Sequence, residues 1–86
     1  MILTVVTINY NNAAGLRRTI ASVANQTFSD FEYVVVDGCS TDGSVAIVEE
    51  NRLNIDQLIV ESDTGIYQAM NKGISLSQGE YILFLN

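Results

Sequence analysis

Histidine is absent from the 86-residue chain, and Cys39 is its only cysteine. A disulfide needs two cysteines, and a structural zinc site needs several cysteine and histidine ligands, so this sequence can assemble neither. A reactive cysteine needs a base that helps to form its thiolate, and no histidine can serve Cys39 in that role. We therefore interpret Cys39 as a small turn residue in a protein of a reducing compartment.

Basic residues are few: four lysines and arginines stand against ten aspartates and glutamates, for a formal net charge of −6. A nucleic-acid backbone requires a basic surface, so no nucleic acid is expected as a partner. Most of the acidic residues are expected to form a solvated surface. An anionic phosphate ligand would need a divalent cation or a helix N-terminus to offset the charge.

Long apolar runs are also missing, and none predicts a transmembrane helix. Residues 1–11 begin apolar but lack a basic segment and are interrupted by Asn9 and Asn11, which predicts a strand rather than a signal peptide. Hydrophobic residues nevertheless make up 48% of the chain, which is enough to form a core. The length allows one small domain or part of a larger one.

Hydrophobic periodicity predicts alternating strands and helices. Apolar runs rich in β-branched residues predict strands over residues 2–8, 31–37, 58–61 and 81–85. Apolar residues three and four positions apart predict one helix from Ala13 and two more over residues 44–52 and 66–77. The spacing fits βαβ units, so we predict an α/β fold with a mainly parallel four-stranded sheet and helices on both of its faces.

Helix ends carry signals of their own. Asn12 is a suitable N-cap for the first helix, and Thr41, Asp42 or Ser44 for the second. Gly73 would let the third helix lie close against the sheet. These residues are therefore assigned to structure rather than to a ligand.

Residues 34–43 form the stretch from which the candidate site is predicted. Three valines predict a strand that is buried on both faces, and this strand runs into a turn that contains Asp37, Gly38, Asp42 and Gly43. Ligands of parallel sheets bind beyond the carboxyl ends of the strands, near the point where the strand order reverses. The predicted carboxyl ends are all polar: Asn9 and Tyr10, Asp37 and Gly38, residues 61–63, and Asn86.

Two familiar phosphate-binding motifs are absent. A dinucleotide fingerprint needs G-x-G-x-x-G after the first strand, where residues 9–15 read NYNNAAG instead. A P-loop needs a Gly-Lys pair, and the chain contains none. A bound nucleotide would therefore be held by carboxylates, backbone groups and a metal ion.

Five motifs in register resemble those of the family 2 glycosyltransferases. They are NYN at residues 9–11, QTF at 26–28, VDGCSTDGS at 36–44, GIYQAMNKG at 65–73 and GEYILFLN at 79–86. The third and fifth motifs resemble most the branch that serves bacterial exopolysaccharide, capsule and O-antigen assembly. The resemblance implies a Rossmann-like GT-A fold, with residues 1–86 as its N-terminal nucleotide-sugar-binding part.

The resemblance also implies which residues bind the nucleotide-diphosphate sugar. Asn9 and Tyr10 would line the nucleobase pocket, with Ile8 contributing backbone, and Asp37 would contact the base or ribose. The implied binding residues are Ile8, Asn9, Tyr10, Asp37, Gly38, Asp63, Gly65 and Asn71. Asn71 would support the donor site or make a structural hydrogen bond. Lys72 is expected to be a solvated surface residue.

The chain departs from the family pattern in two places. Many members carry a second aspartate where this chain has Gly38, which leaves the identity of the nucleobase open. The family's D-x-D metal motif would follow Asn86, so neither a catalytic base nor a metal ligand is assigned within residues 1–86, and the chain alone is expected to be inactive.

For the full-length protein, the resemblance implies a divalent metal, Mn or Mg, and an inverting sugar transfer to a saccharide or lipid-linked acceptor. A cytoplasmic location follows, with peripheral association at the inner face of the plasma membrane compatible with it.

Two alternatives belong to other functional classes. One is a receiver-like signalling domain with Asp37 as the phosphate acceptor, although such a site wants an acidic pair at the position of Asn9 and Tyr10. The other is a non-catalytic nucleotide- or sugar-binding module of the transferase fold.

Overall fold

The computed structural model describes residues 2–86, so Met1 lies outside the described residues. Strands and helices alternate as predicted. In order, the elements are β1 (Leu3–Asn9), α1 (Ala13–Ala24), β2 (Phe31–Asp37), α2 (Ser44–Glu50), the short 3-10 helix η1 (Arg52–Asn54), β3 (Gln57–Val60), α3 (Ile66–Leu76) and β4 (Tyr81–Phe84). Strand β2 has the predicted bounds, and the other elements differ from the prediction only at their ends.

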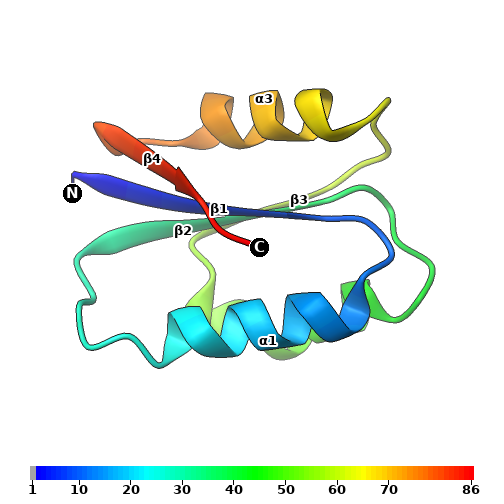
Figure 1. The fold of residues 1–86 in the computed structure, drawn as a ribbon, viewed down its shortest axis with the longest axis horizontal. Coiled ribbons are helices and arrows are strands. Elements are labelled where there is room, and N and C mark those ends of the chain that lie inside the picture. Colours follow the sequence, from blue (N-terminus) through cyan, green and yellow to red (C-terminus); the bar gives the residue numbers. More distant parts are fainter. Residues whose placement is uncertain (1) are drawn as a thin grey trace.

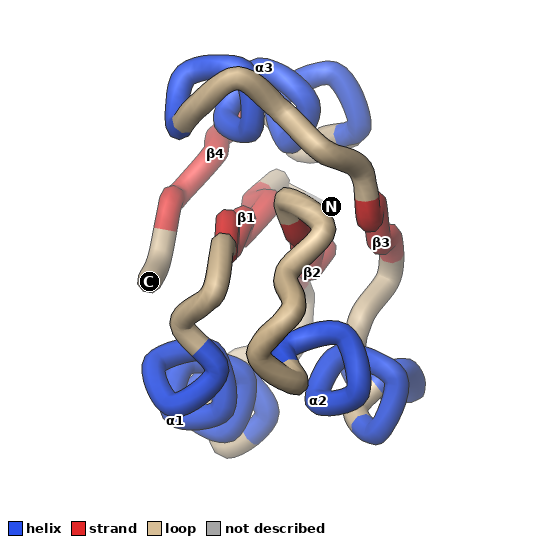
Figure 2. The backbone as a smooth tube through the Cα atoms, turned by 90° about the vertical axis from the view of Figure 1, so that its right-hand side faces the viewer, coloured by secondary structure: helices blue, strands red, loops and turns tan. Residues whose placement is uncertain are grey.

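All four strands are parallel and form one sheet in the order β3-β2-β1-β4. The chain adds β2 and β3 on one side of β1 and then crosses back to place β4 on the other side. Helices α1 and α2 cover one face of the sheet and α3 covers the other (Figure 1, Figure 2). The predicted α/β architecture is confirmed, and the strand order reverses between β1 and β4.

The sheet has an apolar core on each face because its central strands are buried on both sides. Successive side chains of a strand point to opposite faces, so β1 and β2 contribute to both cores. Toward α1 and α2 the buried residues are Val5, Leu16, Ile20, Val23, Tyr33, Val35, Ile47, Val48 and Ile55. Toward α3 they are Val6, Val34, Val36 and Ala69.

Helix α3 lies very close to the sheet, as the position of Gly73 predicts. A Cβ atom on Gly73 would come within 2.6 Å of Cγ1 of Val6. That separation is far inside van der Waals contact, so only a residue without a side chain fits there. The close approach holds the N-terminal half of α3 beside the carboxyl ends of the strands.

The N-terminus of α2 differs from the prediction in its capping residue. Gly43 is the N-cap, in the left-handed conformation with φ of 96°, where a glycine carries no steric cost. Asp42 supports the same turn from one position earlier, because its Oδ1 accepts hydrogen bonds from the Ser44 N–H and hydroxyl. Its Oδ2 accepts from the N–H of Ala13 at the start of α1. One carboxylate therefore joins the first turns of both helices.

Two carboxyls that accept hydrogen bonds within the fold, those of Glu32 and Asp42, have pKa values below their ordinary values. Burial alone would raise the pKa of Glu32, but hydrogen bonds from the Gln78 N–H, the Gln57 amide and the Thr4 hydroxyl outweigh it. For Asp42 the main cause is the hydrogen bond from the Ser44 hydroxyl. Both carboxylates therefore stabilise the folded chain in their charged form.

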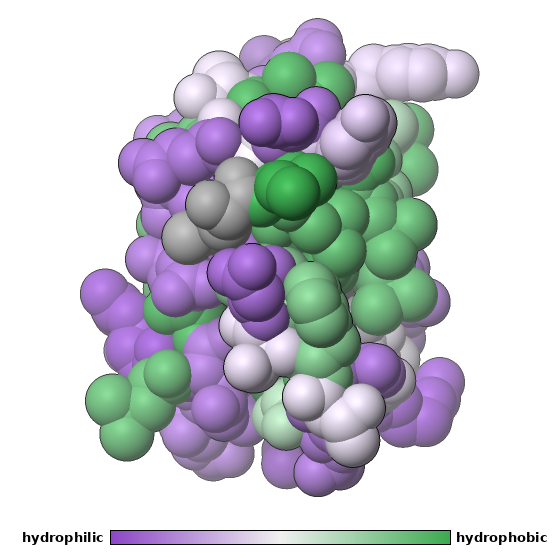
Figure 3. Space-filling view, turned by 90° about the vertical axis from the view of Figure 1, so that its left-hand side faces the viewer, coloured by the Kyte–Doolittle hydropathy of each residue, from purple (hydrophilic) through white to green (hydrophobic). Residues whose placement is uncertain are grey.

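Strand β4 forms an open edge of the sheet. Tyr81 and Leu83 of this strand are 67% and 49% exposed, and Ile2 beside them is 57% exposed. Apolar side chains gather on the right-hand side of the view in Figure 3, the side on which this edge of the sheet lies. Within residues 2–86 no further strand pairs with β4.

Candidate functional site

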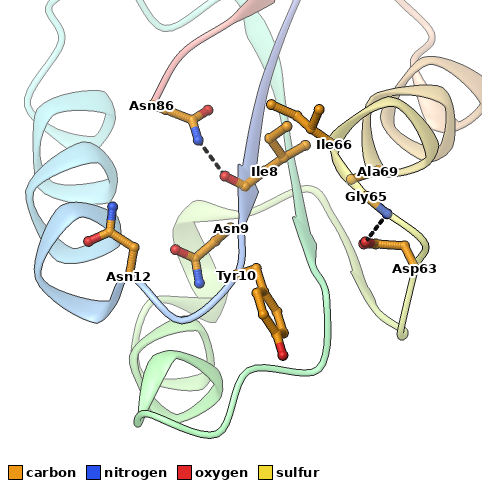
Figure 4. Close-up of a pocket in the computed structure, with 9 residues that line it drawn as sticks. All are labelled: Ile8, Asn9, Tyr10, Asn12, Asp63, Gly65, Ile66, Ala69 and Asn86. Carbon is orange, nitrogen blue, oxygen red and sulfur yellow. Dashed lines mark hydrogen bonds between the residues drawn. The ribbon is translucent and has the colours of Figure 1, made fainter.

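A pocket of about 330 Å³ opens where the carboxyl ends of β1 and β4 meet the start of α3 (Figure 4). Its lining consists of Ile8, Asn9, Tyr10, Asn12, Asp63, Gly65, Ile66, Ala69 and Asn86. The pocket lies at the point where the strand order reverses, which is where open α/β sheets bind their ligands. Its volume falls within the range of small-molecule sites, toward the small end.

The end of β1 supplies one wall of the pocket. Ile8, Asn9 and Tyr10 are consecutive, and the side chain of Tyr10 remains 66% exposed. The side-chain amide of Asn86, just after β4, donates a hydrogen bond to the carbonyl of Ile8. This bond joins the carboxyl ends of two neighbouring strands at the mouth of the pocket (Figure 4).

The loop between β3 and α3 supplies the opposite wall through Asp63 and Gly65. Oδ1 of Asp63 accepts a hydrogen bond from the N–H of Gly65 at 3.2 Å. A Cβ atom on Gly38 would lie 3.1 Å from Oδ2 of Asp63 and 3.2 Å from Cδ1 of Tyr10. Gly38 thus lies directly behind the two pocket residues, and its missing side chain lets them approach the turn after β2.

Asp37 is fully buried and does not line the pocket. Its Oδ1 accepts hydrogen bonds from the Asn9 amide at 2.9 Å and from the Ser40 hydroxyl at 2.8 Å. Its Oδ2 accepts one from the Ser40 N–H at 2.8 Å. In this structure Asp37 therefore orients Asn9 and the turn after β2 instead of facing a ligand.

The burial of Asp37 contradicts the receiver-like alternative. A phospho-acceptor aspartate must be reached by its phosphodonor, and Asp37 has no exposed surface. The residues at the end of β1, Asn9 and Tyr10, supply no acidic pair to bind a metal beside it.

Of the residues implied by the resemblance, the pocket brings together Ile8, Asn9, Tyr10, Asp63 and Gly65. Asp37 and Gly38 lie behind it. Asn71 does not line it, because this side chain is exposed on the side of α3 that faces away from the buried Ala69 and Gly73.

The sequence-based set omits four lining residues: Asn12, Ile66, Ala69 and Asn86. Asn86 already stood out as a polar strand end, and Asn12 as a helix cap, a role that the structure confirms through its hydrogen bond from the Gly15 N–H. Ile66 and Ala69 carry no signal in sequence, because their helical pattern marks them as core residues.

The prediction that Lys72 is a solvated surface residue is wrong. Its side chain is only 18% exposed. The ammonium donates a hydrogen bond to the carbonyl of Ser62 at 3.0 Å and lies 3.3 Å from Oε1 of Glu61. The periodicity of α3 cannot reveal these contacts, since both partners lie in the preceding loop.

The lining combines apolar side chains, asparagine amides and a tyrosine with one carboxylate, that of Asp63. It contains no lysine or arginine, so the pocket itself offers no cation to a phosphate group. Across residues 2–86 no three acidic, cysteine or histidine side chains lie close enough together to hold a metal ion. The pocket is therefore suited to a neutral, hydrogen-bonding and partly aromatic group rather than to a diphosphate or a metal.

The sequence profile described as Glycosyl transferase family 2 matches residues 4–86. This chain belongs to glycosyl transferase family 2. The family 2 chain is 45% identical over 78 residues to the PGL/p-HBAD biosynthesis glycosyltransferase of Mycobacterium bovis, covering 87% of this chain and 30% of the relative. It is 34% identical over 89 residues to TuaG of Bacillus subtilis, which is named for teichuronic acid biosynthesis, covering 99% of this chain and 35% of TuaG.

Solved glycosyltransferases share the fold. The family 2 chain superposes on S. aureus TarS in complex with UDP-GlcNAc with a TM-score of 0.86 and 31% identity, covering 99% of this chain and 26% of TarS. It also superposes on the mannosyltransferase PcManGT from Pyrobaculum calidifontis, which was solved with GDP-Man and Mn²⁺. The TM-score is 0.83 and the identity 26%, and the match covers 93% of this chain and 25% of PcManGT. These neighbours confirm the GT-A fold. The chain spans about a quarter to a third of the length of these relatives. No helix among residues 2–86 has the length and apolarity needed to cross a bilayer.

Proposed function

We propose that this chain is the donor-binding part of a glycosyltransferase that moves a sugar from a nucleotide-diphosphate sugar to a saccharide or lipid-linked acceptor. The observation that carries the proposal is the pocket at the reversal point between β1 and β4. Membership of family 2 supports the reaction class, and TarS and PcManGT, of the same fold, were solved with UDP-GlcNAc and GDP-Man.

The nucleoside end of the donor fits this pocket best. Tyr10 offers an exposed aromatic face on which a base can stack. The carboxylate of Asp63 and the side-chain oxygen of Asn9 provide acceptors for the edge of a base or for ribose hydroxyls, because the Asn9 N–H₂ group already donates to Asp37 and Ser40. Asp37 would act through Asn9, and Gly38 would let Tyr10 and Asp63 pack against the turn after β2.

The diphosphate needs charge that this pocket does not supply. For the whole protein we propose a divalent metal, Mn²⁺ or Mg²⁺, which would neutralise the charge on the departing nucleoside diphosphate. The Mn²⁺ in PcManGT supports this assignment. Residues 2–86 do not provide a fitting ligand set, so we assign no metal ligand and no catalytic base within them.

The relatives suggest the pathway class. The mycobacterial relative is named for PGL/p-HBAD biosynthesis, and TuaG for teichuronic acid biosynthesis. We propose that the whole protein acts similarly in the assembly of a bacterial surface glycan by an inverting transfer, in the cytoplasm, with peripheral association at the inner face of the membrane.

Nucleotide binding tests the proposal directly. Isothermal titration calorimetry of the chain against UDP, GDP and dTDP should show binding of at least one of them. Tyr10→Ala should weaken it by about tenfold, because base stacking on an aromatic ring contributes about 1–3 kcal/mol. Tyr81→Ala is the matched control, since Tyr81 is equally exposed, at 67% against 66%, but lies at the opposite end of the sheet.

Two results would contradict the donor-site assignment: no nucleotide binds, or Tyr81→Ala weakens binding as much as Tyr10→Ala does. We expect the 86-residue chain to bind donor without transferring its sugar. Measurable transfer by the purified chain, with metal and donor supplied, would show that its catalytic groups lie within residues 1–86.

A further inference from the structure

The loop of residues 61–65, between β3 and α3, carries two of the pocket residues but has little packing of its own. Asp63 is half-buried, and the other four residues are exposed. A loop with so few apolar contacts is expected to sample several conformations unless hydrogen bonds hold it. Asp63 and Gly65 therefore depend on hydrogen bonds from neighbouring elements to stay at the pocket wall.

Two side chains of α3 hold this loop, one at each end. The ammonium of Lys72 donates to the carbonyl of Ser62 at 3.0 Å, and its side chain is 18% exposed. Oε1 of Gln68 accepts a hydrogen bond from the N–H of Thr64 at 2.6 Å. Gln68 and Lys72 are four residues apart, so they lie on the same side of the helix.

The bonds made by Lys72 and Gln68 bracket Asp63. Lys72 holds the backbone of Ser62, which precedes Asp63, and Gln68 holds the backbone of Thr64, which follows it. Asp63 then caps the N–H of Gly65 through Oδ1, which leaves Oδ2 directed toward Gly38. The position of the only carboxylate in the pocket lining thus depends on two side chains that do not themselves line the pocket.

We propose that Lys72 and Gln68 are positioning residues that preorganise this loop for the nucleotide donor. The inference rests on the proposed function and deepens it, because it says which residues set the affinity of the same site. A loop that is already held in its bound conformation loses less conformational freedom when the ligand binds. Removing either bond should therefore weaken nucleotide binding without removing any ligand contact.

The salt bridge of Lys72 with Glu61 is the lesser of its two interactions. Glu61 is 63% exposed, and ion pairs in such positions are screened by solvent. The bond to the Ser62 carbonyl, in contrast, fixes the backbone. Glu61→Gln is therefore a control that removes the ion pair and leaves the bond to Ser62 in place.

The test compares the variants Lys72→Met, Lys72→Arg, Gln68→Met and Glu61→Gln with the unmodified chain. Methionine keeps the length and the apolar stem of either side chain but removes its polar end. For each protein, calorimetry gives the dissociation constants for UDP, GDP and dTDP, and thermal melting reports on the fold. Hydrogen exchange without nucleotide measures the protection of the Thr64 and Gly65 amides.

We expect Lys72→Met and Gln68→Met to weaken nucleotide binding by about tenfold, which corresponds to about 1.4 kcal/mol. Both should speed exchange of the loop amides while the melting temperature stays within a few degrees. Lys72→Arg, which retains a cation and hydrogen-bond donors, should restore most of the affinity, and Glu61→Gln should bind as the unmodified chain does.

Three outcomes separate the possibilities. If the unmodified chain binds a nucleotide and both methionine variants bind it within twofold as tightly, the inference is wrong and the proposed function stands. If Glu61→Gln weakens binding as much as Lys72→Met, charge at the loop rather than its backbone anchor sets the affinity, and the inference is again wrong. If the unmodified chain binds none of UDP, GDP and dTDP, the proposed function fails, and the inference fails with it.

Discussion

Asp37 is the residue for which the resemblance and the structure suggest different roles, and the substitution Asp37→Ala separates them. The resemblance implies contact with the nucleoside, whereas the structure buries this side chain completely at the end of β2. Replacement by alanine removes the acceptor of three hydrogen bonds, from the Asn9 amide, the Ser40 N–H and the Ser40 hydroxyl. We expect the main effect to be a loss of stability.

The expected size follows from these three bonds. A hydrogen bond to a charged group contributes about 1.5–3 kcal/mol, and the three share one carboxylate and are not additive, so Asp37→Ala should cost about 3–5 kcal/mol. A chain of this length is expected to have a free energy of unfolding of about 4–13 kcal/mol. The alanine variant would then be near the limit of folding. Asp37→Asn keeps the shape but presents an N–H₂ group to a donor, and should cost about 1–3 kcal/mol.

Urea unfolding followed by circular dichroism gives the free energy of unfolding of each variant by linear extrapolation. Asp63→Asn is the matched control, because it makes the same chemical change in a loop and retains the oxygen that caps Gly65. Its effect on stability should stay within about 0.5 kcal/mol. Nucleotide affinity is measured on the same proteins wherever they are folded.

A structural role for Asp37 would be contradicted if Asp37→Asn and Asp37→Ala each lowered the free energy of unfolding by less than about 1 kcal/mol. If such stable variants also failed to bind nucleotide, Asp37 would be a ligand contact in a conformation that differs from this one. A large loss of stability for the Asp63→Asn control would show that polar changes anywhere near the turn unfold the chain.

Three further predictions concern the fold. Gly73→Val should lower the free energy of unfolding by at least about 1–3 kcal/mol, because its Cβ would lie 2.6 Å from Cγ1 of Val6, and thermal melting would detect the change. Acid should destabilise the chain, because the pKa values of Glu32 and Asp42 are lowered in the folded state. Their contribution to the free energy of unfolding is present above the ordinary pKa values of 4.5 and 3.8, and it is lost as the pH falls through the lower folded values. Urea unfolding at pH 7 and below pH 4 measures this loss, and equal stabilities would contradict it. Burial raises the pKa of the Tyr33 phenol above its ordinary value of 10.0. The stability that Tyr33 contributes below pH 10.0 should therefore be lost as the pH rises through the folded pKa. Comparing the phenolate absorbance of the unmodified chain with that of a Tyr33→Phe variant would show the late titration.

Much of the fold follows from local pattern. Runs such as residues 34–36, with their β-branched side chains, predict buried strands, and the bounds of β2 agree with the structure. Asn12 caps α1 and Gly73 lies against the sheet as predicted. These residues could be interpreted because their roles depend on neighbours in sequence or on a steric requirement that glycine alone meets.

The sequence also determined the family and which residues stand at the carboxyl ends of the strands. Tertiary structure decided which of those ends meet. The placement of β4 beside β1 brings Asn86 to Ile8 and opens the pocket there, a pairing between residues 78 positions apart. Likewise, the side chain of Asp37 is buried because a partner distant in sequence binds it. The side chain of Lys72 binds the preceding loop, whose residues lie outside the helical period of α3. Local chemistry sets the elements, whereas strand order and side-chain direction depend on packing across the whole sheet.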